Sequence, residues 1–207
     1  MRSFIPLAAA VSLFAGTAQA ADPNLVVNGS FEDTVVGSGS WVNVPSINGW
    51  TVTAGPGTGF ELRNNAVGTA FHGANFVELD TTGNSTITQS FDSLMTGGSY
   101  ALSFAYTPRI NQPSATNGIE VLWNGTLLGS TISAAGGATH VWTQHQFQVT
   151  ALAGLNTLSF RSVGSSDTLG GSLDAVSLTS AVPEPGSYAL MLAGLVGVVA
   201  MKRRKPR

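Results

Sequence analysis

Carboxylate side chains are the groups in this sequence whose type and spacing could carry chemistry. Glu78 and Asp80 alternate onto the same face of a predicted strand, and Glu61 and Glu120 lie in other predicted strands. A pair of carboxylates can supply the acid and the base or nucleophile of glycoside hydrolysis, and in a retaining enzyme the two groups lie about 5 Å apart. Acidic side chains on strands are more often solvated surface groups. We therefore expect no catalytic pair and a protein that is not an enzyme.

The other common catalytic and metal-binding motifs are missing from the sequence. Because the chain contains no cysteine, it has no disulfide framework, no thiolate zinc site and no cysteine nucleophile. The three histidines, His72, His140 and His145, lack the close spacing on one element that a zinc site uses. The sequence has no Gly-x-Ser-x-Gly nucleophile elbow. These absences support the expectation of a non-catalytic protein.

Charged residues are few and unevenly distributed along the chain. They make up 10% of the residues, against about a quarter in an ordinary soluble domain. Five of the nine basic residues stand at positions 202–207, so only Arg63, Arg109 and Arg161 oppose the ten acidic residues between Asp22 and Asp174. The middle of the chain therefore has a net charge of about −7 and lacks the basic patch of a nucleic-acid-binding protein. We expect no nucleic acid among the partners.

The first 20 residues have the pattern of a secretory signal peptide. Arg2 supplies the positive start, residues 4–15 are almost wholly apolar, and Ala18-Gln19-Ala20 places small residues where signal peptidase reads them. About 12 apolar residues are too few to cross a bilayer, which needs roughly 20. We therefore expect signal peptidase to cleave after Ala20, and residues 1–20 to be absent from the mature protein.

The other end of the chain combines a Pro-rich motif, an apolar run and a basic tail. Pro183-Glu184-Pro185 precedes residues 187–201, which carry no charge, and Lys and Arg follow at 202–207. Fifteen residues of helix reach about 22 Å, less than a hydrocarbon core of roughly 30 Å. The run therefore predicts a short hydrophobic helix that holds the chain at the inner membrane transiently. The basic tail is expected to stay on the cytoplasmic side.

This order of features over residues 182–207 resembles the PEP-CTERM sorting signal of Gram-negative bacteria. The resemblance implies that an exosortase recognises Pro183, Glu184 and Pro185 and cleaves the chain near them, in a bacterium that makes extracellular polysaccharide. An ordinary tail anchor is the alternative. The expected location of the mature protein is the cell surface or the extracellular matrix.

Residues 21–181 have the pattern of a single all-β domain. Short alternating runs are separated by Gly, Asn, Ser and Pro, and no window keeps helical periodicity. Asn124-Gly125 joins two of the runs and favours a type I′ hairpin, because both central residues of that turn need positive φ. We expect strands at residues 25–27, 49–53, 59–63, 75–79, 86–91, 100–107, 119–123, 126–132, 142–150, 157–162 and 173–178. About eleven short strands fit two packed antiparallel sheets.

Alternation also assigns the faces of two predicted strands. One face of the run at 100–107 carries Tyr100, Leu102, Phe104 and Tyr106. We predict that this apolar face points to the core. In the run at 142–150, a single face carries Trp142, Gln144, Gln146 and Gln148. Trp142 is therefore either a core residue displaced by a bulge or an aromatic side chain on an exposed polar face.

Five segments of this domain occur in a recognisable order. They run from Asn-Leu-Val-Val-Asn-Gly-Ser-Phe-Glu at 24–32, through 49–50, 76–80 and 98–104, to Leu-Asp-Ala-Val-Ser-Leu at 173–178. Together they resemble the galactose-binding-like jelly rolls, which include the DUF642 group and family 4/9-type carbohydrate-binding modules. The resemblance implies a jelly-roll β-sandwich and an expectation of sugar binding. It names no ligand, because one fold can host many functions.

The same resemblance implies a structural calcium ion that uses Glu32, Asp174 or both. Glu32 follows the predicted opening strand and Asp174 lies in the last one, and these two ends of the domain meet in such jelly rolls. Hard carboxylate and carbonyl oxygens are the ligands that Ca²⁺ prefers. Asp174 alternates with Val176 and Leu178, so it is predicted to point inward, where an unpaired charge is unfavourable. A hydrogen-bonded structural aspartate is the alternative to calcium.

Sugar binding needs an aromatic face for the apolar side of a pyranose ring and polar groups for its hydroxyls. Trp50 matches a core position of the jelly rolls, so we expect it to be buried. Trp41 lies in a polar stretch and Trp142 heads the glutamine face, so these two are the predicted binding aromatics. Arg109 and Asn111 are the predicted polar contacts. They lie in a long polar loop at 108–118, for which a tolerated surface loop is the alternative.

From these features we expect an exported, non-catalytic protein that binds extracellular polysaccharide or is embedded in it. A purely structural matrix or surface protein without sugar recognition is the first alternative, and a carbohydrate-active enzyme is the second. An exposed Trp41 or Trp142 would favour binding, and burial of all four tryptophans would favour a scaffold. Convergence of Glu78 with Glu61 or Glu120 in a cleft would favour the enzyme.

Overall fold

A computed structural model describes residues 23–57 and 59–181 of the chain. The predicted signal peptide at 1–20 and the predicted sorting segment at 182–207, with Pro183, Glu184 and Pro185, lie outside the described residues. Within the described part, no helix has the length and hydrophobicity needed to cross a membrane. Its strands are β1 (Ser40–Val44), β2 (Thr51–Ala54), β3 (Phe60–Asn64), β4 (Asn75–Glu78), β5 (Thr86–Phe91), β6 (Ser99–Thr107), β7 (Gly118–Trp123), β8 (Thr126–Leu127), β9 (Thr143–Thr150), β10 (Asn156–Val163) and β11 (Ser172–Ser180).

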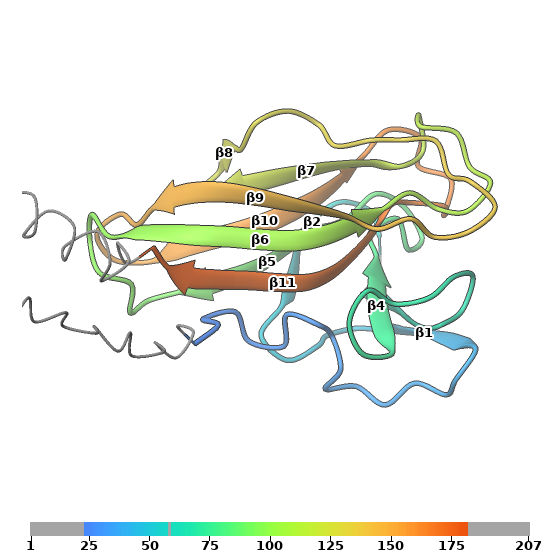
Figure 1. Ribbon diagram of the computed structural model, residues 1–207, viewed down its shortest axis with the longest axis horizontal. Helices are drawn as coiled ribbons and strands as arrows, with labels where there is room; N and C mark the ends of the chain where they lie inside the picture. Colours follow the sequence, from blue (N-terminus) through green and yellow to red (C-terminus); the bar gives the residue numbers. More distant parts are fainter. Residues whose placement is uncertain (1–22, 58, 182–207) are drawn as a thin grey trace, which may run out of the picture.

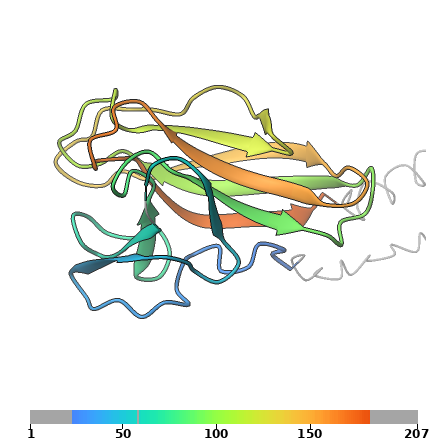
Figure 2. The same cartoon turned by 180° about the vertical axis from the view of Figure 1, so that it is seen from behind.

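The strands form two antiparallel sheets that pack face to face (Figure 1). The six-stranded sheet has the order β1-β3-β4-β11-β6-β9, and the five-stranded sheet has the order β2-β5-β10-β7-β8. Strands that follow one another along the chain, such as β4 to β7 and β9 to β11, alternate between the two sheets. This crossing pattern is that of a jelly-roll β-sandwich, and it confirms the predicted all-β fold class. Figure 2 shows the same two layers from behind.

The core lies between the two sheets and is built from alternate side chains. The inward residues of β6 are Tyr100, Leu102, Phe104 and Tyr106, all of them buried as predicted. Phe104 packs edge to face on Phe160 of β10, with ring centroids 5.0 Å apart. Trp50 is 1% exposed and lies 6.0 Å from the Phe160 ring, so its predicted burial is confirmed. Edge-to-face packing of Phe104 on Phe160 therefore contributes to the contact between the two sheets.

A bulge in β11 turns Asp174 away from this core. Ala175 has a left-handed φ of 48°, and the pairing of β11 with β6 shifts in register just after Asp174. Asp174 is the cross-strand partner of Ala105, whose neighbour Phe104 faces inward. Because cross-strand partners share a face, Asp174 lies on the outer face of the six-stranded sheet. The prediction of an inward Asp174 is therefore wrong, because the bulge adds a residue and breaks the alternation.

Two of the predicted strands also differ from the structure, and one observed strand was not predicted. Residues 25–27 do not form a strand, although the Leu25 N–H donates to the Leu178 carbonyl at 2.8 Å. The run predicted at 126–132 is a strand only at β8, and the predicted hairpin has positive φ at both Asn124 and Gly125. Strand β1 was not predicted, because an edge strand whose residues are mostly exposed has only a weak hydrophobic pattern.

The N-terminal segment packs on the β11 bulge through Gly29, and this contact yields a stability prediction. The Val176 N–H donates to the Gly29 carbonyl at 2.8 Å, and a Cβ on Gly29 would lie 2.0 Å from the Val176 oxygen. We expect Gly29→Ala to lower the free energy of unfolding by about 2 kcal/mol or more, because the obstructing atom belongs to the backbone.

The matched control is Gly37→Ala, whose added Cβ would meet nothing closer than 3.6 Å. That change is expected to alter the free energy of unfolding by no more than about 0.5 kcal/mol. Denaturant unfolding of the two variants measures the difference. Equal stabilities would contradict the packing described for Gly29.

Candidate functional site

The outer face of the six-stranded sheet is polar where β1, β3 and β4 lie side by side. The strand registers place the outward residues in two rows, Trp41, Arg63 and Phe76 in one and Asn43, Glu61 and Glu78 in the other. Alternation in β3 puts two charged residues outward on either side of the buried Leu62. Residues of these two rows form the base of the candidate site.

Four charged side chains form a buried ion-pair cluster on this face. Arg63 binds Glu61 through one guanidinium nitrogen and Glu78 through Nε, at 2.9 Å from the Glu78 carboxylate. Arg109, from the connection between β6 and β7, binds the same Glu78 oxygen. The Gly170 N–H donates to the other Glu78 oxygen at 2.8 Å. The two guanidinium groups therefore balance the two carboxylates, as buried charges require.

Burial sets the proton affinity of the two carboxylates in this cluster. Burial raises the pKa of Glu78 to about 7, against the opposite effect of the Arg63 and Arg109 charges. Burial also raises the pKa of Glu61, and Arg63 again opposes the change. The side chain of Glu78 is wholly inaccessible to solvent, and both of its oxygens accept hydrogen bonds. Glu78 therefore holds the arginines in place, and Glu61, whose side chain is 6% exposed, is the carboxylate of the pair that lines the cleft.

The long loop at 108–118 is ordered, and it places Arg109 over the sheet. The fully buried Asn117 organises the loop: its side-chain oxygen accepts the Arg109 N–H at 2.9 Å. The Asn117 amide donates to the carbonyls of Pro113 and Ala134, each at 3.1 Å. Because these bonds fix the backbone beside Arg109, the guanidinium reaches Glu78 from a defined direction. The loop thus has a positioning role that its composition alone does not reveal.

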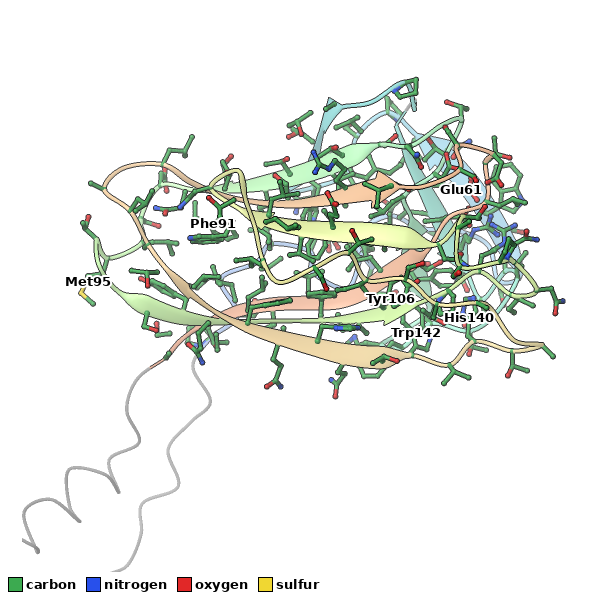
Figure 3. The ribbon with its side chains drawn as sticks, turned by 90° about the horizontal axis from the view of Figure 1, so that it is seen from above. Glu61, Phe91, Met95, Tyr106, His140 and Trp142 are labelled. Carbon is green, nitrogen blue, oxygen red and sulfur yellow. The ribbon has the colours of Figure 1, made fainter. Side chains whose placement is uncertain are left out.

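A cleft of about 390 Å³ opens above the ion-pair cluster. It is lined by Trp41, Asn43, Glu61, Arg63, Val67, Thr81, Thr82, Arg109, Thr168 and Leu169. Of these lining residues, Trp41 is 55% exposed to solvent. Within the described residues, Arg63 Nη1 and Thr81 Oγ1 are buried without a hydrogen-bond partner. Figure 3 shows Glu61 at one end of the sandwich. The cleft thus joins an open aromatic face to hydrogen-bonding groups of both kinds.

Two of the four predicted sugar contacts meet in this cleft, and two do not line it. Trp41 and Arg109 lie far apart in the sequence, and both line the cleft. Asn111 is exposed on the same loop as Arg109, but its backbone N–H bonds the Gly137 carbonyl outside the cleft. The cluster partners Arg63 and Glu78 were not predicted as a pair. The sequence feature that could have revealed this cluster is the alternation of charged residues in β3, in a chain that has few charged residues.

Trp142 belongs to a separate aromatic cluster on the same sheet face. Its ring lies 5.8 Å from Phe76, 6.2 Å from Phe71 and 5.5 Å from His140, all in edge-on geometry. Its indole N–H donates to the Thr69 carbonyl at 2.8 Å. Trp142 is therefore a partly covered aromatic residue on the outer face, and no bulge has displaced it from the core. Its predicted role in sugar binding, like that of Asn111, stays a prediction.

The glutamine face forms a second, shallower groove of about 350 Å³ between β6, β9 and β11. Its lining includes Ala101, Ser103, Gln146, Gln148 and Thr179. The aromatic residue of the groove, Phe147, is partly buried and stacks on Phe104, with ring centroids 6.2 Å apart. The groove therefore offers amide groups but lacks an open aromatic face like that of Trp41.

Glu32 and Asp174, the predicted calcium ligands, both bind the turn at 71–75. Glu32 accepts the N–H groups of Ala74 and Asn75 at 2.9 and 2.7 Å. Asp174 accepts those of Phe71 and His72 at 2.8 and 2.9 Å on one oxygen, and that of Ala175 at 2.6 Å on the other. Three of the four carboxylate oxygens thus have backbone donors, as the hydrogen-bonded alternative expects.

The donor set at this turn is chemically suited to calcium but small. Carboxylate oxygens are hard ligands and keep further lone pairs after accepting one hydrogen bond. The charge of Glu32 adds to burial in raising the pKa of Asp174, so the two carboxylates lie close enough to repel each other. Among the described residues, no group of three His, Cys, Asp or Glu side chains could hold a metal ion. Backbone carbonyls would have to complete the ligand set.

The C-terminal end of the chain matches a known family model. Residues 181–205 match the PEP-CTERM protein-sorting motif. This match confirms the resemblance seen in the sequence of that segment. The motif indicates an exported protein that is sorted to the cell surface.

Two curated bacterial toxins share a segment with this chain. The multifunctional-autoprocessing repeats-in-toxin of Vibrio cholerae serotype O1 is 36% identical over 158 residues, which are 76% of this chain and 3% of the toxin. The protein of the same name from Vibrio vulnificus is 36% identical over 154 residues, or 74% of this chain and 3% of the toxin. The chain therefore spans about 3% of the length of the curated relatives it matches.

Similar folds occur among solved structures of carbohydrate-binding modules. A family 35 module from Paenibacillus barcinonensis has 18% sequence identity and a TM-score of 0.41, covering 69% of this chain and 100% of that one. The strand order of the chain itself defines the sandwich described above. The likeness to the DUF642 group stays a prediction.

The environment of Asp174 yields a prediction about pH. Burial raises the pKa of Asp174 to about 6 in the folded protein, from an ordinary value of 3.8. Because the folded state then binds the proton more tightly than the unfolded chain, protonation favours folding, and this contribution is lost as pH rises through about 6. In the presence of a chelator, we expect the melting temperature to rise as pH falls from about 7.5 to about 5.

Asp174→Asn is expected to reduce this dependence of melting temperature on pH, because it removes the titrating group. Asp92→Asn, a change at an exposed carboxylate, is the control and is expected to leave the dependence unchanged. Thermal melts across the pH range measure both variants. A wild-type pH dependence in Asp174→Asn would contradict the role given to this carboxylate.

Proposed function

We propose that this protein is exported, processed by an exosortase, and binds neutral extracellular polysaccharide without chemical conversion. The observation that carries the proposal is the cleft in which an exposed Trp41 faces hydrogen-bonding groups of Glu61, Arg63 and Arg109. The sorting motif supports export. Signal peptidase removes residues 1–20, and residues 187–201 hold the chain in the inner membrane of a Gram-negative cell before cleavage near Pro183–Pro185.

The cleft suits a sugar because its two kinds of surface match the two sides of a pyranose ring. The C–H groups of one ring face stack on Trp41, as apolar surface on an indole. Arg109 donates hydrogen bonds to hydroxyl oxygens, whereas Glu61 and Asn43 accept from hydroxyl groups. Each sugar hydroxyl both donates and accepts, so a site with both kinds of partner binds it well.

The charge of the cleft favours a neutral sugar over an acidic one. The Glu61 and Glu78 carboxylates are already paired with both arginines. A uronate would bring a further negative charge to a domain whose net charge is about −7. Weak affinity per site is sufficient for attachment, because many copies act together along one polysaccharide.

Glu61 and Glu78 converge beside the cleft, which is the arrangement that would favour an enzyme. They are cross-strand partners and share Arg63 as a counter-ion, whereas Glu120 pairs with Arg161 on the other sheet. A glycosidase needs two carboxyl groups that both reach the scissile bond. Glu78 is wholly buried, and both of its oxygens are occupied by donors, so this arrangement favours binding over hydrolysis.

The scaffold alternative is less favoured because of the tryptophans. Trp50 and Trp123 are buried, but Trp41 is 55% exposed and lies at the cleft edge. An indole open to solvent beside polar groups matches the aromatic platform that sugar binding uses.

The binding proposal predicts the effect of removing the aromatic face. Trp41→Ala should weaken binding of neutral polysaccharide about tenfold or more, because the stacked ring face is lost. The melting temperature should change little, since Trp41 is on an edge strand and exposed. Isothermal calorimetry against polysaccharides of the producing bacterium measures the affinity. The control is Leu127→Ala, another exposed apolar side chain, on β8 of the opposite sheet.

Three outcomes would contradict parts of this proposal. Absence of binding across a glycan array and the host polysaccharide would favour the scaffold. Tighter binding of uronate polymers than of neutral ones would contradict the charge argument. Release of new reducing ends from the polysaccharide, lost in Glu61→Gln, would establish the enzyme instead.

We also propose that Ca²⁺ binds at Glu32 and Asp174 and stabilises the turn at 71–75. A cation between them relieves the repulsion of the two carboxylates and leaves their backbone hydrogen bonds in place.

Chelation is expected to lower the melting temperature, because a ligand that binds only the folded state stabilises it by about 2.7 kcal/mol at a hundredfold excess over its Kd. Asp174→Asn should abolish the difference, and the exposed Asp92→Asn should preserve it. An unchanged melting curve in chelator would remove the calcium and leave the hydrogen-bonded alternative.

A further inference from the structure

One end of the sandwich carries an exposed apolar surface, here called the apolar tip. It consists of Met95 in the loop between β5 and β6, and Leu152 and Leu155 in the loop between β9 and β10, with the partly buried Leu94 beside Met95 in the sequence. Met95 is 72% exposed, Leu152 58% and Leu155 63%. Large apolar side chains gathered at one end of a soluble domain indicate an interaction surface.

The two loops of the apolar tip are ordered and adjacent. The Gly97 N–H donates to the Ala151 carbonyl at 2.8 Å, and the Ala151 N–H donates to the Gly98 carbonyl at 3.0 Å. The fully buried Asn156 accepts the Leu152 N–H at 2.8 Å and donates to the Leu152 carbonyl at 3.0 Å. The exposed side chains are therefore held outward by a fixed backbone.

The described chain begins and ends near the apolar tip. β11 finishes at Ser180, and the Ala181 N–H donates to the Ser99 carbonyl at the start of β6. At the other terminus, the Leu25 N–H donates to the Leu178 carbonyl near the end of β11. The first and last described residues lie toward the same end of the sandwich in the two opposite views (Figures 1 and 2). Figure 3 places Met95 at this end and Glu61 at the opposite one.

The sequence beyond Ala181 identifies the surface that lies close to the apolar tip. Five residues, 182–186, separate Ala181 from the uncharged run at 187–201, and five extended residues span at most about 18 Å. A chain whose uncharged run sits in a bilayer therefore keeps this end of the sandwich beside the lipid. The two tip loops, residues 92–98 and 151–155, contain no Lys or Arg and a single charged residue, Asp92, so contact with lipid headgroups cannot depend on attraction to anionic lipid.

We propose that the apolar tip docks on the lipid surface while the tail is still in the membrane. This inference rests on the proposed membrane stage of the export route. Docking inserts Met95, Leu152 and Leu155 at the headgroup boundary through apolar contact. It stands the sandwich upright, with the cleft of Trp41 and Glu61 at the end away from the bilayer. The cleft is then free to bind polysaccharide before the tail is cut.

The natural absence of cysteine makes a site-specific test possible, because one introduced cysteine is the sole labelling site. The full chain carrying Leu155→Cys with a polarity-sensitive dye is reconstituted in phosphatidylcholine vesicles that contain a nitroxide-labelled lipid. We expect a blue shift and quenching of the dye. The matched control is Val141→Cys, which is 68% exposed and outside the tip loops, and its dye is expected to stay unquenched. Adding Met95→Ser and Leu152→Ser to Leu155→Cys should reduce the quenching.

The outcomes separate docking from anchoring. A chain that does not float with the vesicles contradicts the membrane stage and the docking that rests on it. A chain that floats with equal dye signals at the two positions contradicts the docking alone. Disulfide-linked dimers through Leu155→Cys without lipid quenching would show that a second copy covers the tip, and this also contradicts docking on lipid. Sugar affinity of the Trp41 cleft is independent of all three results.

Discussion

Neutralisation of the buried Glu78 carboxylate is the constraint on which the candidate site depends. A charge that is wholly removed from solvent needs counter-ions and hydrogen-bond donors within the protein. Here they come from three separate parts of the chain: Arg63 on β3, Arg109 on the loop after β6, and the Gly170 N–H before β11. Satisfying one carboxylate therefore draws two strands and two loops together and defines the floor of the cleft. Removing one partner would leave the others buried and unpaired, a change that typically destabilises a protein by about 3–5 kcal/mol.

The two ends of the sandwich differ in their chemistry. At one end, buried charge and loop hydrogen bonds hold an open cleft with Trp41 at its edge. At the other, the loops contain exposed apolar residues such as Leu155, and the described chain begins and ends there. The proposed C-terminal tether and the proposed sugar binding would each use one of these two ends. The aromatic core between the sheets, in which Phe104 packs edge to face on Phe160, lies between the two ends as a close-packed body.

Local patterns in the sequence predicted the fold better than the site. Strict alternation identified β6 and its core face, because side-chain direction in a strand depends only on neighbouring residues. Edge strand β1 lacked that pattern, and the bulge at Ala175 reversed it for Asp174. The aromatic and loop candidates Trp41 and Arg109 were found by residue type, yet their meeting depends on strand register and loop path. The role of Arg63 was missed for the same reason, since non-local pairing leaves little trace in a single sequence.

The central claim is that the cleft above the ion-pair cluster binds neutral polysaccharide. The most direct measurement is nuclear magnetic resonance of the ¹⁵N-labelled protein during titration with neutral oligosaccharides from the host matrix. The account predicts that the indole N–H of Trp41 and the guanidinium signals of Arg63 and Arg109 shift together and saturate with one apparent affinity. Shifts confined to the groove of Gln146 and Gln148, or a spectrum that no oligosaccharide changes, would contradict it.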